Sequence, residues 1–310
     1  MRSAVAPEAR ERSPHRPGPG PLPEALLRSL DLAVRRRVEG MLAGDHRSSL
    51  LGRGTELAQV RPYVPGDDVR RIEWNVTART GETHVRVDVA ERVLVTWIVL
   101  DASVSMTFGT AERRKADVAE GVCLAVGHLA SRRGNRLGVV TFGGPKRRAV
   151  PPRQGRTGML ALLLALREEP PAEGPGDGSL AEGLMTVGRF ARQRSLIVIV
   201  SDFRGPKDWR GPLLQLAGGH DVVAIEIRDP REQSLPNMGE LRLVDPETGR
   251  QLRVDTSNAR LRERFEQAAA AEREEVRSEL ASLAVGHVVV STEGDWLRMV
   301  AAYLRRGAHR

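Results

Sequence analysis

The sequence predicts an α/β protein with an open, mostly parallel sheet that has helices on both faces. Short continuous apolar runs such as 93–100 (VLVTWIVL) and 195–200 (SLIVIV) are typical of strands buried on both sides. Stretches with apolar residues three and four positions apart, typical of amphipathic helices, separate these runs. Strands that alternate with helices in this way indicate a parallel sheet covered on both faces.

The first 92 residues are expected to lie outside this sheet. Residues 1–22 are rich in proline, arginine and glycine, which predicts a disordered tail. Apolar residues recur at helical spacing from Leu27 to Met41, and valines alternate with charged residues over 85–89. We therefore expect a small N-terminal helix and strand-turn subdomain over 23–92 and the main domain over 93–305.

The elements expected in the main domain follow from the same two patterns. The predicted strands are 93–100, 137–142, a short one at 148–150, 195–200, 222–227 and 288–291, with a hairpin of 241–244 and 251–254 around the turn residues 245–249. The predicted helices are 118–129, 159–166, 180–191, 259–283 and 295–304.

Composition excludes several classes of protein. The chain has 310 residues, a net charge of +8 and one cysteine, Cys123, so it has neither an internal disulfide nor a cysteine-rich zinc site. The longest apolar run is far shorter than the roughly 20 residues of a membrane span, so we expect a cytoplasmic protein. Basic residues are scattered and aromatics make up only 4%, which argues against nucleic-acid binding.

Acidic and hydroxyl residues follow two of the predicted strands. Asp101, Ser103 and Ser105 form a D-x-S-x-S sequence after the first strand, and Asp202 follows the strand at 195–200. Ser179 opens a helix between them. Because sites in open parallel sheets form beyond the carboxyl ends of strands, we expect these oxygens to converge there. Such a donor set suits Mg²⁺, Mn²⁺ or Ca²⁺, with water or an acidic group of a partner completing the coordination.

Each of these residues also has an ordinary structural interpretation. Asp101 fits a cap of the following turn, and Ser179 with Glu182 fits a capping box. Asp202 is able to pair with the nearby Arg204 or Lys207. A lysine or arginine head group between Asp101 and Asp202 would exclude the metal interpretation. A second candidate for the hydroxyl ligand, Thr157, precedes a helix that comes early in the chain.

The order of these motifs resembles a von Willebrand factor A domain with its metal-ion-dependent adhesion site. The stretch 53–80 (RGTELAQVRPYVPGDDVRRIEWNVTART) further resembles the signature of the bacterial domain of unknown function 58 family, as do the segments 228–232 and 245–250. The resemblance covers about 48–305. It implies a von Willebrand factor A-like fold, a metal site at Asp101, Ser103, Ser105, Ser179 and Asp202, and a MoxR-type AAA+ ATPase as partner.

Two positions depart from the adhesion-site pattern, and one feature departs from many members of the family. Serine replaces threonine at 179, and Phe203 stands where a small residue usually follows the aspartate, a change that is expected to crowd the site. Many relatives carry N-terminal membrane helices, whereas this chain is expected to lack them.

The expected function is a non-enzymatic, divalent-metal-dependent protein-interaction module that helps assemble or mature other proteins. The alternative is a phosphatase-like hydrolase with Asp101 as nucleophile, although Ser103 stands where the usual second carboxylate would be. In the N-terminal subdomain, Asp67, Asp68 and Trp74 are expected to form either a packed turn with Trp74 buried against the main domain or a surface that binds a partner.

Overall fold

The computed structural model describes residues 18–20, 22–24, 57–88, 94–130, 135–166, 176–244 and 250–307. They belong to two compact units, one within 38–94 and one formed by 1–37 and 95–310. The expected helix over 27–41 and the turn at 245–249 lie outside the described residues. The predicted domain boundaries stay predictions.

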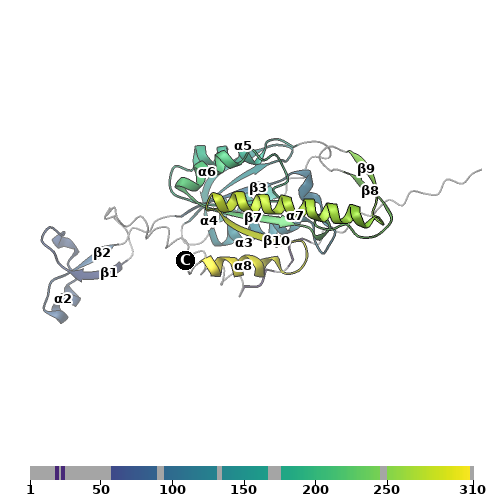
Figure 1. The fold of residues 1–310 in the computed structure, drawn as a ribbon. Helices are drawn as coiled ribbons and strands as arrows, with labels where there is room; N and C mark the ends of the chain where they lie inside the picture. The colour runs from purple at the N-terminus through teal and green to yellow at the C-terminus, as the bar shows by residue number, and fades with distance from the viewer. Residues whose placement is uncertain are drawn as a thin grey trace, which may run out of the picture. The chain divides into compact units, whose positions relative to one another are not determined.

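A six-stranded sheet forms the centre of the larger unit in the part of the chain that the structure describes (Figure 1). Its strands are β3 (Val95–Asp101), β4 (Arg136–Phe142), β5 (Arg148–Gln154), β6 (Leu196–Ser201), β7 (Asp221–Arg228) and β10 (Gly286–Ser291). The order is β10-β7-β6-β3-β4-β5, and only β5, at one edge, is antiparallel to its neighbour. This is the doubly wound order, which reverses between β3 and β6.

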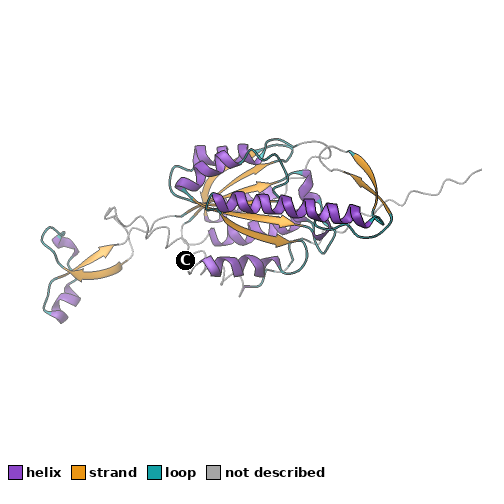
Figure 2. Cartoon of the chain, viewed as in Figure 1, coloured by secondary structure: helices purple, strands orange, loops and turns teal. Residues whose placement is uncertain are grey.

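Helices cover both faces of this sheet (Figure 2). On one face lie α3 (Lys115–Ala130), α4 (Gly155–Leu166) and α8 (Trp296–Gly307); on the other lie α5 (Leu180–Phe190), α6 (Arg210–Gly219) and α7 (Ala259–Ser282). Along β3, Ile98 and Leu100 pack into the first layer, whereas Trp97 and Val99 pack into the second. The predicted α/β fold, an open and mostly parallel sheet with helices on both faces, is therefore confirmed.

One helix of the larger unit differs from the expectation. Helix α6 was not predicted, because its residues RGPLLQLAGG include three glycines and a proline, which are poor helix formers. Its buried Leu213 and Leu216 stabilise it by packing into the second layer. The predicted hairpin is confirmed as β8 (Glu240–Val244) and β9 (Gln251–Asp255), which are antiparallel.

The smaller unit contains the antiparallel pair β1 (Leu57–Pro62) and β2 (His84–Asp88), as a strand-turn unit requires. It also contains the short helix α2 (Trp74–Thr80), which the sequence did not predict because β-branched residues are frequent in it. The helix ends at Gly81, whose φ of 75° is the left-handed conformation common at helix C-termini.

Part of the expected N-terminal tail contacts the larger unit. The Trp296 indole Nε1 donates a hydrogen bond to the Pro19 carbonyl at 3.0 Å, and Leu22 packs against the first-layer core. Among the described helices, none has the length and apolar character that a membrane crossing needs.

Candidate metal and partner site at the switch point of the sheet

The predicted site residues lie where the strand order reverses. Asp101 ends β3, and the Ser201–Phe203 segment ends the neighbouring strand β6. The two strands are paired in register, with Leu100 opposite Val200. The structure therefore brings Asp101 and Asp202 to the same edge of the sheet, as the sequence predicted for strand-end side chains.

Asp101 is buried and anchors the loop that follows it. Its Oδ1 accepts a hydrogen bond from the Ser103 amide at 3.0 Å, and its Oδ2 accepts one from the Ser201 hydroxyl at 2.5 Å. The Ser103 and Ser105 hydroxyls lie 3.0 Å apart. One carboxylate and two adjacent hydroxyl oxygens are thus gathered in a single loop.

The surroundings of Asp101 disfavour its negative charge. Burial raises the pKa of this carboxyl to about 6, and the charge of Asp202 adds to the rise, against the hydrogen bonds from Ser103 and Ser201. Among the described residues, no lysine or arginine is paired with Asp101. A cation at this carboxylate would therefore remove an electrostatic cost that the protein itself leaves in place.

Asp202, by contrast, has a cation of its own. The ammonium of Lys115, on the first turn of α3, lies 2.5 Å from the Asp202 carboxylate and 2.7 Å from Glu232. The Lys115 side chain is completely buried. Burial alone would raise the pKa of Asp202, but the charge and hydrogen bond of Lys115 outweigh it and lower the pKa.

The expectation that Asp202 pairs with a basic side chain is thus correct, but the partner is Lys115. Lys207 pairs with Glu275 instead, and the Arg204 guanidinium lies 3.5 Å from Glu232. The Arg204 backbone amide donates to Asp202 at 3.1 Å. Lys115 was not recognised from the sequence, because it follows two arginines in a charged run that is typical of an exposed helix start.

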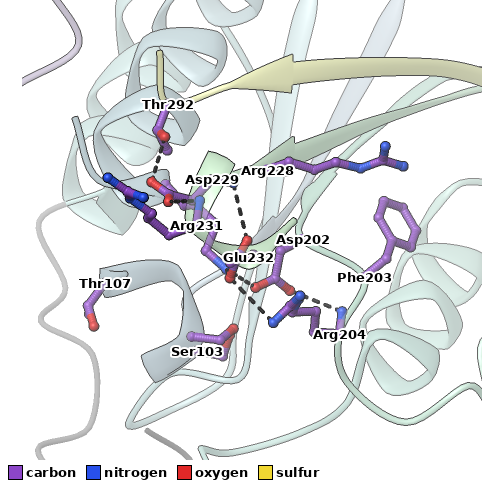
Figure 3. Close-up of polar contacts among 12 residues, drawn as sticks. Ser103, Thr107, Asp202, Phe203, Arg204, Arg228, Asp229, Arg231, Glu232 and Thr292 are labelled. Atoms are coloured by element: carbon purple, nitrogen blue, oxygen red, sulfur yellow. Dashed lines mark hydrogen bonds and ion pairs between the residues drawn. The ribbon is translucent and has the colours of Figure 1, made fainter. Parts of the chain in front are cut away.

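Glu232, the second acid paired with Lys115, belongs to the 228–232 segment (Figure 3). Asp229 is fully buried and accepts hydrogen bonds from the Thr110 amide at 2.8 Å and from the Thr292 hydroxyl at 2.7 Å. The Asp229 amide in turn donates to Glu232 at 3.2 Å. These contacts tie β7 to the loop before α3 and to the end of β10, and they fix the position of Glu232 against Lys115.

Ser179 caps helix α5, so the capping-box interpretation is confirmed. Its hydroxyl accepts from the Glu182 amide at 3.4 Å, while the Glu182 carboxylate accepts from the Ser179 amide at 3.3 Å. The Ser179 hydroxyl also lies 3.4 Å from Asp208. A metal-ligating role for Ser179 stays a prediction, as does the weaker one for Thr157, which is exposed on α4.

A cavity of about 280 Å³ opens beside Asp101. Its polar lining comes from Asp101, Ser103, Ser179 and Ser201, and its apolar lining includes Phe142, Leu180, Phe203, Pro206 and Trp209. Phe203 has a φ of 57°, a conformation that is unfavourable for a bulky residue. Its ring packs edge-on against Trp209 with centroids 5.7 Å apart, so it forms a wall of the cavity.

The loop that carries Ser179 is held by close backbone contacts. The Gly143 amide donates to the Asp177 carbonyl at 3.0 Å, and the Asp177 amide donates to the Gly144 carbonyl at 2.6 Å. A Cβ on Gly176 would lie 1.7 Å from the Gly143 carbonyl oxygen. Only glycine therefore permits this approach.

We expect Gly176→Ala to lower the free energy of unfolding by about 2 kcal/mol, since the backbone must move to relieve the clash. Gly205→Ala is the matched control, because a Cβ there meets no atom within 4 Å. Urea unfolding of both variants checks this. Equal stabilities would mean that the 143–144 and 176–178 segments are not in contact.

The three residues singled out in the smaller unit have different environments. Asp67 accepts two hydrogen bonds from the Arg61 guanidinium, which holds the pKa of that carboxyl below its usual range, and Asp68 caps a short 3₁₀ helix at Val69–Arg71. Trp74 is not buried within its unit: 70% of its surface is exposed. A partner-binding role for these residues stays a prediction.

The fold and the site define a doubly wound α/β protein with an oxygen-lined edge at its switch point. The chain belongs to the family described as "Protein of unknown function DUF58", whose profile matches residues 59–275. It is 40% identical over 289 residues to the uncharacterized protein Rv1480 of Mycobacterium tuberculosis and to Mb1516 of Mycobacterium bovis. These alignments cover 92% of this chain and 90% of each relative. The predicted family is confirmed.

Solved structures with a similar arrangement have low sequence identity. The conserved hypothetical protein BatB of Bacteroides thetaiotaomicron is 14% identical, with a TM-score of 0.45, over 70% of this chain and 100% of BatB. The VWA domain of SpRpn10 is 15% identical, with a TM-score of 0.38, over 67% of this chain and 94% of that domain. The strand order of the sheet itself defines the doubly wound α/β fold.

Proposed function

We propose that this protein is an interaction module that holds a divalent cation, Mg²⁺, Mn²⁺ or Ca²⁺, in the Asp101 loop and binds an acidic group of a protein partner through it. The observation that carries the proposal is Asp101 itself: a buried carboxylate at the switch point, unpaired with any lysine or arginine of the described residues, beside an open cavity. The cation would supply the positive charge that this position lacks.

The oxygen ligands of the Asp101 loop fit a hard cation. The Asp101 carboxylate and the Ser103 and Ser105 hydroxyls are oxygen ligands of the kind that these ions prefer. Within the described residues, no three acidic, histidine or cysteine side chains come together as a metal cluster, so water and the partner must complete the coordination.

The ammonium of Lys115 pairs with Asp202 and, among the described residues, not with Asp101, so it counts against the metal interpretation at Asp202 alone. A carboxylate has about four acceptor positions. At Asp202 the Lys115 ammonium, the Arg204 amide and the Ser105 hydroxyl use three of them. In our proposal Asp202 therefore positions Ser105 and adds negative potential, and the ion is held chiefly by the Asp101 loop.

We expect Asp101→Ala to weaken Mn²⁺ binding at least about tenfold, because it removes the charged ligand of a site with few other ligands. Titration of the full chain followed by the electron paramagnetic resonance of free Mn²⁺ measures this. Asp255→Ala is the matched control, since Asp255 is an exposed acid that only caps its own turn. Wild-type affinity in the Asp101 variant would contradict the proposed site.

The resemblance to the family supports a MoxR-type AAA+ ATPase, or a client of that ATPase, as the partner. We expect retention of the purified ATPase on the immobilised full chain in Mg²⁺, and its loss in EDTA or with Asp101→Ala. Retention that survives both treatments would show that contact with the ATPase does not use the cation.

A further inference from the structure

The apolar lining of the cavity next to Asp101 has no role in holding a cation. Phe142, Leu180, Phe203 and Trp209 line it together with the polar edge. Apolar cavities of about 150 Å³ already accommodate benzene. A volume of 280 Å³ is therefore sufficient for a leucine-sized side chain.

One polar group in this lining lacks a partner. The Trp209 indole Nε1 is buried and has no hydrogen-bond partner among the described residues. A buried donor left unsatisfied costs about 1–3 kcal/mol. This donor is enclosed within the wall of the cavity, so its N–H resonance is able to report changes of the wall when a ligand enters.

The apolar wall is also joined to the polar edge by direct contacts. The Ser201 hydroxyl donates to Asp101 and accepts from the Phe203 amide at 3.0 Å. Phe203, in its unfavourable backbone conformation, packs against Trp209. Strain of this kind persists where the surrounding structure imposes it and is frequent at binding sites. The same hydroxyl thus positions the carboxylate and the apolar wall.

We propose that this cavity is a specificity subsite that binds an aliphatic side chain directly after the partner's acidic residue, against the apolar wall of Phe203 and Trp209. This inference rests on the proposed function, because it assigns the neighbour of the acid that the cation would bind. The partner segment would be an acidic residue followed by a leucine-like residue. Gly205 in the lining leaves room for its backbone, because an added Cβ there would meet no atom within 4 Å.

Two dipeptides test the inference on the ¹⁵N-labelled full chain in Mg²⁺: N-acetyl-Asp-Leu-amide and N-acetyl-Asp-Ala-amide. The readout is the indole N–H resonance of Trp209, assigned with Trp209→Phe. We expect the leucine peptide to bind about tenfold more tightly, because burial of each additional methylene favours binding.

Gly205→Leu adds a bulky side chain at a residue that lines the cavity and is expected to abolish the preference for leucine, whereas Gly211→Leu is expected to retain it. The two glycines form a matched pair, because an added Cβ meets nothing within 4 Å at either, and only Gly205 lines the cavity. Three outcomes would each overturn the inference. They are equal affinity for the two peptides, no shift of the Trp209 resonance at about 10 mM peptide, and a preference for leucine that survives Gly205→Leu.

The variant Asp101→Ala distinguishes failure of the apolar subsite from failure of the proposed function. If both peptides bind equally and both require Asp101, the cation-dependent function stands and the apolar subsite is wrong. If the leucine preference persists while binding no longer depends on Asp101 or Mg²⁺, the subsite stands and the proposed function is wrong.

Discussion

Replacement of Lys115 by methionine is expected to lower the free energy of unfolding by about 3–5 kcal/mol. The substitution leaves the carboxylates of Asp202 and Glu232 buried without their shared cation, and breaking a buried ion pair from one side has a cost of this size. Denaturant unfolding at pH 7, followed by circular dichroism, measures the loss.

Lys207→Met is the matched control, because the Lys207 pair with Glu275 is exposed. Exposed pairs contribute about 0–1 kcal/mol, so this variant is expected to be nearly as stable as the wild type. The triple variant Lys115→Met, Asp202→Asn, Glu232→Gln is expected to recover much of the loss by removing the buried charges. A Lys115 variant as stable as the control would contradict the buried network.

Asp101→Asn, in contrast, is expected to stabilise the metal-free protein above pH 6 by about 1–3 kcal/mol. The folded protein raises the pKa of Asp101 from 3.8 to about 6, so deprotonation of this group opposes folding. Its contribution to stability is fully present below pH 3.8, is lost as the pH rises through about 6, and stays absent above that. The neutral amide has no such loss.

Unfolding in EDTA at pH 4 and pH 8 tests this sign. We expect the two proteins to be similar at pH 4 and the asparagine variant to be the more stable at pH 8. Asp202→Asn should behave in the opposite way, because Lys115 lowers the pKa of Asp202 and its charge therefore favours folding at neutral pH. A less stable Asp101→Asn variant at pH 8 would mean that a cation of the protein already compensates this carboxylate.

The strands and the strand-end acids were predictable because both depend on local patterns. Continuous apolar runs locate β3 and β6, and the rule that parallel strands end at one edge places Asp101 and Asp202 together. Ser179 was correctly interpreted as a helix cap, since the capping box spans only four residues.

Lys115 and the cavity were not predictable, because they depend on contacts between distant segments. Lys115 meets Asp202 and Glu232 across separations of 87 and 117 residues, and no local pattern distinguishes it from an exposed lysine. Phe203 was expected to crowd the site, whereas its ring packs against Trp209 and lines the cavity. The backbone angle that turns the ring this way has no signature in the sequence.

The antiparallel edge strand β5 restricts how another chain is able to join this protein. Pro151 and Pro152 lie within β5, where the pairing with β4 is irregular between Leu137 and Val139. Proline has no amide hydrogen to donate, so an incoming strand cannot form a continuous ladder along this margin. The β5 edge of the sheet is thereby protected against edge-to-edge pairing with another chain.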